Sequence, residues 1–340
     1  MRNKVTIQQI ADLAGLSKFA VSRALAGKPG VSPQTRDLII KTAGQLGYFH
    51  EASSAPVART DRNESMTAGA VAILFPNIRY QNQENEYWGS IFSSIVQRLE
   101  ELSLDVLTLT QPARDNLSNI LNPEGILGVI TVGTVSTQVL LDIRQLGIPI
   151  VMIDHSDPAI PCDSLFADNQ AGIHELMTIL ISKGYRSFQF FGPTSFSRSF
   201  YERWQSYRSA LESFRVPYRQ DEKLITTEGE ELHAHVQQLV RDSQLPEVFV
   251  CANDWEAMML TEWLRAEGKA VPDDCAVTGF DDSPDAAAMT PGLTTVRVSK
   301  ELLGSRAVDQ LIWRASNRGS NPERKLIAGE VVIRDSIGKK

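Results

Sequence analysis

The chain has 340 residues, a hydrophobic content of 42%, a charged content of 22% and a formal net charge of −7. This length and composition are typical of a soluble globular protein with two or three domains. No stretch approaches the ~20 consecutive apolar residues of a membrane-spanning helix, and the first residues lack the apolar segment of a signal peptide. We therefore expect a cytoplasmic protein without a membrane partner.

The first 47 residues predict three short helices joined by two tight connections. Thr6 precedes an apolar run and Gln9 follows three residues later, a spacing that predicts a capping box at the start of the first helix. Ala14 and Gly15 end that helix. A third helix is predicted from Ser32, where a capping residue precedes a proline, to Gly47.

The second helix begins after Ser17, which can cap it. Its apolar residues Val21 and Leu25 predict the inward face. The side chains left on the outer face near its N-terminal end are those of Lys18, Phe19, Ser22 and Arg23. Two helices joined by a turn of small residues are typical of a helix-turn-helix, whose second helix enters the major groove of DNA.

Charge separates this head from the rest of the chain. Residues 1–60 contain eight Lys or Arg and three Asp or Glu, which gives a local net charge of +5. Because the whole chain has a net charge of −7, the remaining residues carry a net charge of −12. A basic head on an acidic body is suited to binding a polyanion through the head alone. The alternative is a small helical cap on an enzyme, in which Lys18 and Arg23 are ordinary solvated charges.

The segments VTIQQIADLAG, SKFAVSRALAGKPGVSPQTRDLI and LGY resemble the headpiece of the LacI/GalR family of bacterial transcription regulators. The resemblance implies that Lys18, Phe19 and Ala20 read base edges while neighbouring residues contact sugar-phosphate. Because Phe19 and Ala20 are apolar, contact with thymine methyl groups is favoured there, although Phe19 could instead belong to the core of the head. The implied DNA-contacting residues are Thr6, Ser17, Lys18, Phe19, Ala20, Ser22, Arg23, Val31, Ser32, Thr35 and Val57.

A linker is predicted over residues 50–67, which are rich in Ser, Ala and charged residues. The family places a short hinge helix here, and its apolar minor-groove wedge would be Val57. Pro56 costs roughly 3 kcal/mol inside a helix unless it lies in the first turn, as it would if Ser54 were the cap. The alternative is an unstructured tether.

From residue 68 onward, apolar strands alternate with amphipathic helices, which predicts an α/β fold with parallel sheets. Two such series follow each other and predict two doubly wound lobes, which resemble the periplasmic-binding-protein-like core of the same family. We expect a head over 1–49, a first lobe over about 68–168 with 298–322, and a second lobe over about 169–297 with 323–340. The chain would cross between the lobes near Asp168, Arg297 and Pro322.

Ligands of doubly wound sheets collect at the carboxyl ends of the strands. Asn253 and Asp281 follow two predicted strands and could bind sugar hydroxyls, while Asp254 and Asp282 beside them could instead cap the next helices. The resemblance makes Arg203 the effector-binding arginine, which would otherwise be a solvated helix charge. The implied effector site consists of Tyr87, Trp88, Arg203, Trp204, Asn253, Trp255 and Asp281, although the aromatic residues could equally be core.

These features predict a homodimeric, sequence-specific DNA-binding regulator, expected to be a repressor of a carbohydrate utilisation operon. It would bind a near-palindromic double-stranded operator and respond to a small molecule, expected to be a sugar or sugar derivative. The alternatives are a solute-binding protein with an accessory head and an enzyme that uses the acids of the cleft. No GxSxG, GxxxxGK[ST] or HExxH motif occurs and the three cysteines are widely spaced, so we expect no catalytic residue, metal or cofactor.

Overall fold

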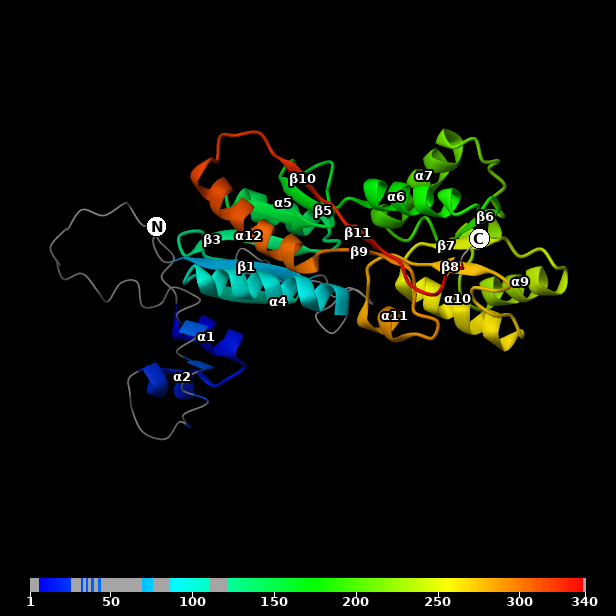
Figure 1. Cartoon of the computed structure of the whole chain (residues 1–340). Helices are drawn as coiled ribbons and strands as arrows, with labels where there is room; N and C mark the ends of the chain where they lie inside the picture. Colours follow the sequence, from blue (N-terminus) through cyan, green and yellow to red (C-terminus); the bar gives the residue numbers. More distant parts are fainter. Residues whose placement is uncertain are drawn as a thin grey trace. The chain divides into compact units, whose positions relative to one another are not determined.

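A computed structural model describes residues 6–25, 32, 35, 38–39, 42–43, 69–75, 86–110 and 121–338. The predicted Val31 and Val57 contacts and the linker over 50–67 lie outside these residues. The chain divides into two compact units, which are described separately below (Figure 1). Unit 1 consists of residues 1–88, 92–164 and 304–323, and unit 2 of residues 89–91, 165–303 and 324–340.

The head contains α1 (Ile7–Ala14) and α2 (Lys18–Leu25). The predicted capping box is confirmed, because the Thr6 amide donates to Gln9 Oε1 at 2.8 Å and the Gln9 amide donates to Thr6 Oγ1 at 3.3 Å. Gly15 ends α1 in the left-handed conformation, with φ of 64°. Beyond α2, the described residues Thr35, Leu38, Ile39, Thr42 and Ala43 are helical. The core of the head consists of Ile10, Ala11, Val21, Ala24, Ile39 and Ala43.

Unit 1 is built around parallel strands. Strand β1 pairs with β2 on one side and β3 on the other, and β3 pairs with β4, all in parallel. The whole sheet has the order β10-β5-β4-β3-β1-β2. Strand β10 and the last three residues of β5 belong to unit 2 in the division given above. The elements are β1 (Ala70–Phe75), α4 (Glu86–Glu101), β2 (Asp105–Thr110), β3 (Ile126–Val132), α5 (Thr137–Gln145), β4 (Ile150–Ile153), β5 (Asp163–Ala167) and α12 (Lys300–Ser316).

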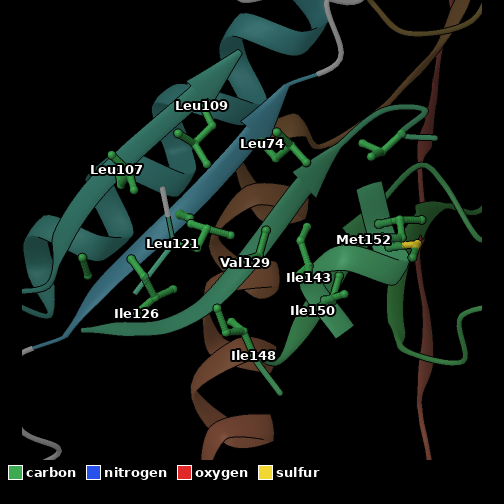
Figure 2. Packing of buried hydrophobic residues seen from close by; sticks show 14 of the residues in the cluster. Leu74, Leu107, Leu109, Leu121, Ile126, Val129, Ile143, Ile148, Ile150 and Met152 are labelled. Atoms are coloured by element: carbon green, nitrogen blue, oxygen red, sulfur yellow. The ribbon is translucent and has the colours of Figure 1, made fainter. Parts of the chain in front are cut away.

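Helices cover both faces of the unit 1 sheet, as a doubly wound fold requires. Alternate residues of β1 point to opposite faces. Leu74 belongs to the cluster that includes Ile143 of α5, and Figure 2 shows these side chains with their neighbours on the sheet. Phe75, the next residue, contacts Phe92 of α4 edge to face, with ring centroids 5.3 Å apart. The predicted α/β class is therefore confirmed for this unit.

Unit 2 contains a second parallel sheet, β6-β7-β8. Helices α9 and α10 pack on one face through a cluster that includes Leu232, Leu260 and Phe249. On β6, Phe190 instead contacts Tyr207 of α7, at 5.7 Å between ring centroids. The elements are α6 (Asn169–Ser182), β6 (Phe188–Phe191), α7 (Arg198–Ser213), α8 (Lys223–Thr226), α9 (Gly229–Arg241), β7 (Val248–Cys251), α10 (Asp254–Ala266), β8 (Ala276–Thr278), α11 (Pro284–Ala288), β9 (Thr295–Arg297), β10 (Arg324–Ile327) and β11 (Glu330–Val332).

Apart from the short segment 89–91, which is grouped with unit 2, the chain passes between the units after Ser164, Leu303 and Glu323. The sequence placed these crossings near Asp168, Arg297 and Pro322. The first falls within β5 and the second within α12, so neither coincides with the end of an element. Composition and turn signals mark the ends of elements, and for that reason they do not locate such crossings to the residue.

Candidate nucleic-acid interface and candidate effector site

The head presents the N-terminal end of α2 to solvent. Ser17 Oγ accepts a hydrogen bond from the Ala20 amide at 3.2 Å, which fixes the start of the helix as predicted. Val21 and Ala24 are buried in the core of the head. Because successive residues of a helix lie 100° apart, Lys18, Phe19 and Ser22 are turned outward, and all three are exposed.

Phe19 is 70% exposed, so its alternative assignment to the core of the head is wrong. The guanidinium of Arg23, which is half-buried, lies 5.4 Å from the centre of the Phe19 ring. The cation is attracted to the face of the ring, so the two side chains stay together on the surface of the head. The pair offers an apolar face and a positive charge side by side, the combination that a thymine methyl and a nearby phosphate require.

The remaining predicted contacts of the head lie near helix starts. Ser32 Oγ accepts from the Thr35 amide at 3.1 Å and lies 2.7 Å from Thr35 Oγ1. These hydroxyl groups flank the N-terminus of a helical segment, a position whose partial positive charge favours phosphate. Thr6 is exposed and holds the equivalent position at α1.

In unit 2, Arg203 of α7 is 3% exposed, so its alternative assignment as a solvated helix charge is wrong. Its Nε donates to Asn169 Oδ1 at 2.9 Å, its Nη1 to the Ala252 carbonyl at 2.8 Å and its Nη2 to Asp281 Oδ1 at 3.3 Å. The guanidinium carbon lies 3.7 Å from the centre of the Phe280 ring. Three of five N–H groups are therefore engaged by the described residues, and one on each terminal nitrogen remains.

The cluster forms because parallel strands end at the same edge of a sheet. Ala252 follows β7, and Phe280 and Asp281 follow β8, so the two chain segments meet beside α7. The Asp281 carboxylate is bound to Arg203, and its backbone carbonyl accepts from Lys300 Nζ at 2.7 Å. Burial raises the pKa of Asp281, while Arg203 and Lys300 act in the opposite direction. Among the described residues, Asp281 Oδ2 has no hydrogen-bond donor, so it is available to a ligand hydroxyl.

The helix-capping alternatives for Asp254 and Asp282 are both wrong. Asn253 is the N-cap of α10, because its Oδ1 accepts from the Glu256 amide at 2.9 Å. Ser283 caps α11. Asp282 instead accepts from two arginine side chains, Arg297 Nε at 2.7 Å and Arg334 Nη2 at 2.6 Å. For Asn253, the predicted ligand residue, capping occupies the side-chain oxygen and leaves the amide nitrogen for other partners.

The predicted aromatic residues differ in exposure and in the elements that hold them. Trp255 is 66% exposed, which rules out a core role, and Trp204 lies on α7 against Tyr201, with ring centroids 5.6 Å apart. Tyr87 and Trp88 form an edge-to-face pair at 4.9 Å in unit 1, where Trp88 is 8% exposed. The low exposure of Trp88 fits the core alternative.

Two positions at this site escaped the sequence analysis. Asn169 follows β5 and donates its Nδ2 to Glu202 Oε2 at 3.0 Å, which orients its oxygen toward Arg203. It lies just after the end of a strand, the same signal that identified Asn253 and Asp281. Phe280 was not predicted, because an aromatic residue beside a strand usually belongs to the core. Here its ring also stacks on the Arg203 guanidinium.

Comparisons with known proteins agree with both parts of the molecule. The signature described as "Bacterial regulatory proteins, lacI family" matches residues 6–50, and that of a "Periplasmic binding protein-like domain" matches residues 177–337. The HTH-type transcriptional regulator MalR of Streptomyces coelicolor is 28% identical, over 97% of this chain and 96% of its own. The probable HTH-type transcriptional repressor ExuR of Bacillus subtilis is 25% identical, over 98% of each chain.

Solved structures share the fold along nearly the whole chain. The transcriptional regulator CelR–cellobiose complex superposes with a TM-score of 0.67 at 24% identity, over 98% of this chain and 99% of that one. The lac repressor dimer bound to operator and the anti-inducer ONPF gives a TM-score of 0.65 at 19% identity, over 99% and 100%.

A helix-turn-helix head joined to an α/β core with a buried arginine cluster defines a DNA-binding transcription regulator. The chain belongs to the LacI family of bacterial regulatory proteins, and its relatives are transcriptional regulators rather than enzymes. Within the part of the chain that the structure describes, no helix combines the length and the apolar character needed to cross a membrane.

Proposed function

We propose that this protein is a transcriptional repressor of a carbohydrate utilisation operon, whose operator affinity changes when a sugar binds beside Arg203. The observation that supports this most is the buried guanidinium, which has two N–H groups without an acceptor among the described residues, next to a carboxylate oxygen to which none of those residues donates. A vicinal diol needs both hydrogen-bond donors and hydrogen-bond acceptors at such spacing. Relatives with cellobiose or ribose bound support the same ligand class.

The operator would be a near-palindromic duplex bound by a homodimer, as in the lac repressor dimer bound to operator. In each head, Lys18, Phe19 and Ala20 would contact base edges, while the hydroxyl groups of Ser17, Ser22 and Ser32 and the charge of Arg23 would contact sugar-phosphate. Thr6, Val31 and Thr35 would complete this surface, and Val57 would enter the minor groove. Such a protein acts in the cytoplasm, where the chromosome is.

The three parts of the chain would have separate roles. Residues 1–49 form the head, 50–67 the hinge, and 68–340 the effector-binding and dimerisation core, in the two lobes predicted above. Tyr87, Trp88, Trp204, Asn253 and Trp255 would join Arg203 and Asp281 around the sugar when it is bound. Because ligand and operator act on one equilibrium between conformations of the dimer, each would change the affinity for the other by the same factor.

Two measurements on the intact protein test this proposal. Selection of duplexes from a random library, followed by fluorescence anisotropy at physiological salt, should yield a preferred near-palindromic site. Calorimetry with cellobiose, ribose, galactose and maltose should identify a sugar that binds. No preference over random duplex would contradict the regulator, and no binding by any sugar would contradict the sugar effector.

A pair of variants connects the second measurement to the site. Arg203→Lys keeps the charge and removes the planar fork, so sugar affinity should fall by roughly 10- to 100-fold, the value of one or two hydrogen bonds to a charged group. Operator affinity without sugar should stay the same. Arg186→Lys in the same unit is the matched control, because the Arg186 guanidinium donates to the carbonyls of Ile181 and Tyr185, at 2.8 and 2.7 Å, instead of entering the cluster.

A further inference from the structure

Asp254 lies beneath the chain segment that presents Asp281 to Arg203. It is 2% exposed, at the start of α10. Its amide donates to the Phe280 carbonyl at 2.9 Å, and its Oδ2 accepts from the Ser283 amide at 2.7 Å. The carboxylate and amide of one residue therefore hold the chain both immediately before Asp281 and two residues after it.

The segment that Asp254 holds is strained. Asp281 has φ of 116° and Asp282 has φ of 51°, a region that residues with a side chain rarely adopt. Each such residue costs on the order of 1–3 kcal/mol and persists only where surrounding contacts impose it. The Asp282 side chain is held by Arg297 and Arg334, and the Asp281 backbone is held by a strand-like bridge with Arg297. Asp254 supplies the remaining contacts, with the Phe280 carbonyl and the Ser283 amide.

Two neighbouring residues, Gly279 and Thr295, leave space for the Asp254 carboxylate and bind it. A Cβ at Gly279 would overlap Asp254 Oδ1, so glycine is required there for the carboxylate to reach the turn. Thr295, which is fully buried, donates its hydroxyl to Asp254 Oδ1 at 2.5 Å. The side chain thus has a partner on each oxygen, and neither partner is part of the Arg203 cluster.

We propose that Asp254 is a positioning residue for effector binding, which holds the turn formed by residues 280–283 so that Asp281 faces Arg203. This inference rests on the proposed function of the cluster. It does not require Asp254 to touch the ligand, since both of its carboxylate oxygens are already occupied. It assigns a role to the second residue of the Asn253-Asp254 pair, which neither capping nor direct ligand contact explains.

The charge of Asp254 is of secondary importance to this role. Burial and, after it, the nearby Asp281 raise its pKa to about 7, against the bonds from Thr295 and Ser283, which lower it. The other charged groups around the turn are Asp282, Lys300, Arg297 and Arg334. An uncharged side chain of the same shape should therefore serve. Asparagine can accept from the Ser283 amide through its oxygen and donate to the Thr295 hydroxyl through its nitrogen.

Three variants of the full-length protein test the inference. Asp254→Ala removes both side-chain bonds and Asp254→Asn retains the shape. Thr295→Val, of similar volume, removes the bond to Asp254 Oδ1 and the longer one that the Asp282 amide donates to the Thr295 hydroxyl at 3.4 Å. Thr261→Val is the matched control, because Thr261 is a buried threonine whose hydroxyl donates to a helix carbonyl, at Ala257. Hydrogen exchange at the Ser283 amide, without any ligand, reports whether the turn is held.

Asp254→Ala should lose protection at the Ser283 amide and bind the sugar at least roughly tenfold more weakly, with operator affinity unchanged. Asp254→Asn should restore both, and Thr295→Val should lie between them, while Thr261→Val should bind the sugar as the wild type does. Normal protection in Asp254→Ala would overturn the inference, and so would lost protection with unchanged affinity for cellobiose, ribose, galactose or maltose. If no sugar binds the wild type, the proposed effector fails, whereas the exchange data still decide whether Asp254 holds the turn.

Discussion

Asp254→Asn should change how the stability of unit 2 depends on pH. In the folded protein, burial raises the pKa of Asp254 from 3.8 to about 7, with Asp281 as the next cause. A pKa raised by about 3 units corresponds to roughly 4 kcal/mol, the cost of ionising this carboxyl in the folded state. The folded state binds the proton more tightly than the unfolded state, so this group stabilises at low pH, and the contribution is lost as pH rises through 7.

The difference between wild type and variant isolates this one group. Glu256, on the same helix, also has a pKa raised by burial to about 7, so the wild-type curve alone would mix two titrations. Urea titrations followed by circular dichroism at pH 5, 6, 7 and 8 should show the wild type losing about 2–3 kcal/mol relative to Asp254→Asn, mostly below pH 7. Asp285→Asn, at an exposed carboxylate, is the control. Parallel curves for wild type and Asp254→Asn would refute the reasoning.

Three further outcomes follow from single residues. Lys18→Ala should weaken binding to the selected duplex by about 1–3 kcal/mol and relax its sequence preference in anisotropy titrations, and an unchanged preference would contradict base contact. Gly15→Ala should lower the stability of the head by about 1 kcal/mol in thermal unfolding, because Gly15 has φ of 64°, a backbone conformation that is unfavourable for alanine. The added methyl group would meet no other atom, so an unchanged unfolding midpoint would refute this backbone effect. Asp163→Ala should cost about 3–5 kcal/mol, since it removes the carboxylate that pairs with the buried Arg314 at 2.6 and 2.7 Å and leaves the guanidinium charge bonded to backbone carbonyls instead. Wild-type stability in urea would refute this.

Local signals predicted much of the architecture. The capping box at Thr6, the cap at Ser17 and the stop at Gly15 all depend on side chains a few residues apart, and all are confirmed. The alternation of apolar strands with amphipathic helices likewise predicted both parallel sheets. The short strands β9 and β11 were not predicted, because they pair antiparallel with each other, outside the alternation of strands and helices that indicates the parallel sheets.

The candidate effector site was only partly predictable. Arg203 lies one helical turn from the buried residues Phe200 and Tyr207, so its inward direction could have been read from helix periodicity. The roles of Asn253 and Asp254 could not, because both are good capping residues. The choice between them depends on Thr295 and Ser283, which lie far along the chain. Such tertiary partners leave no local pattern in the sequence.

The most direct test of the central claim is reciprocal linkage in the intact protein. Operator affinity should be measured by anisotropy with and without a saturating concentration of the sugar that binds, and sugar affinity by calorimetry with and without operator. We predict that each ligand changes the affinity for the other by the same factor, of about 5- to 150-fold. A bound sugar that leaves operator affinity unchanged would contradict the account.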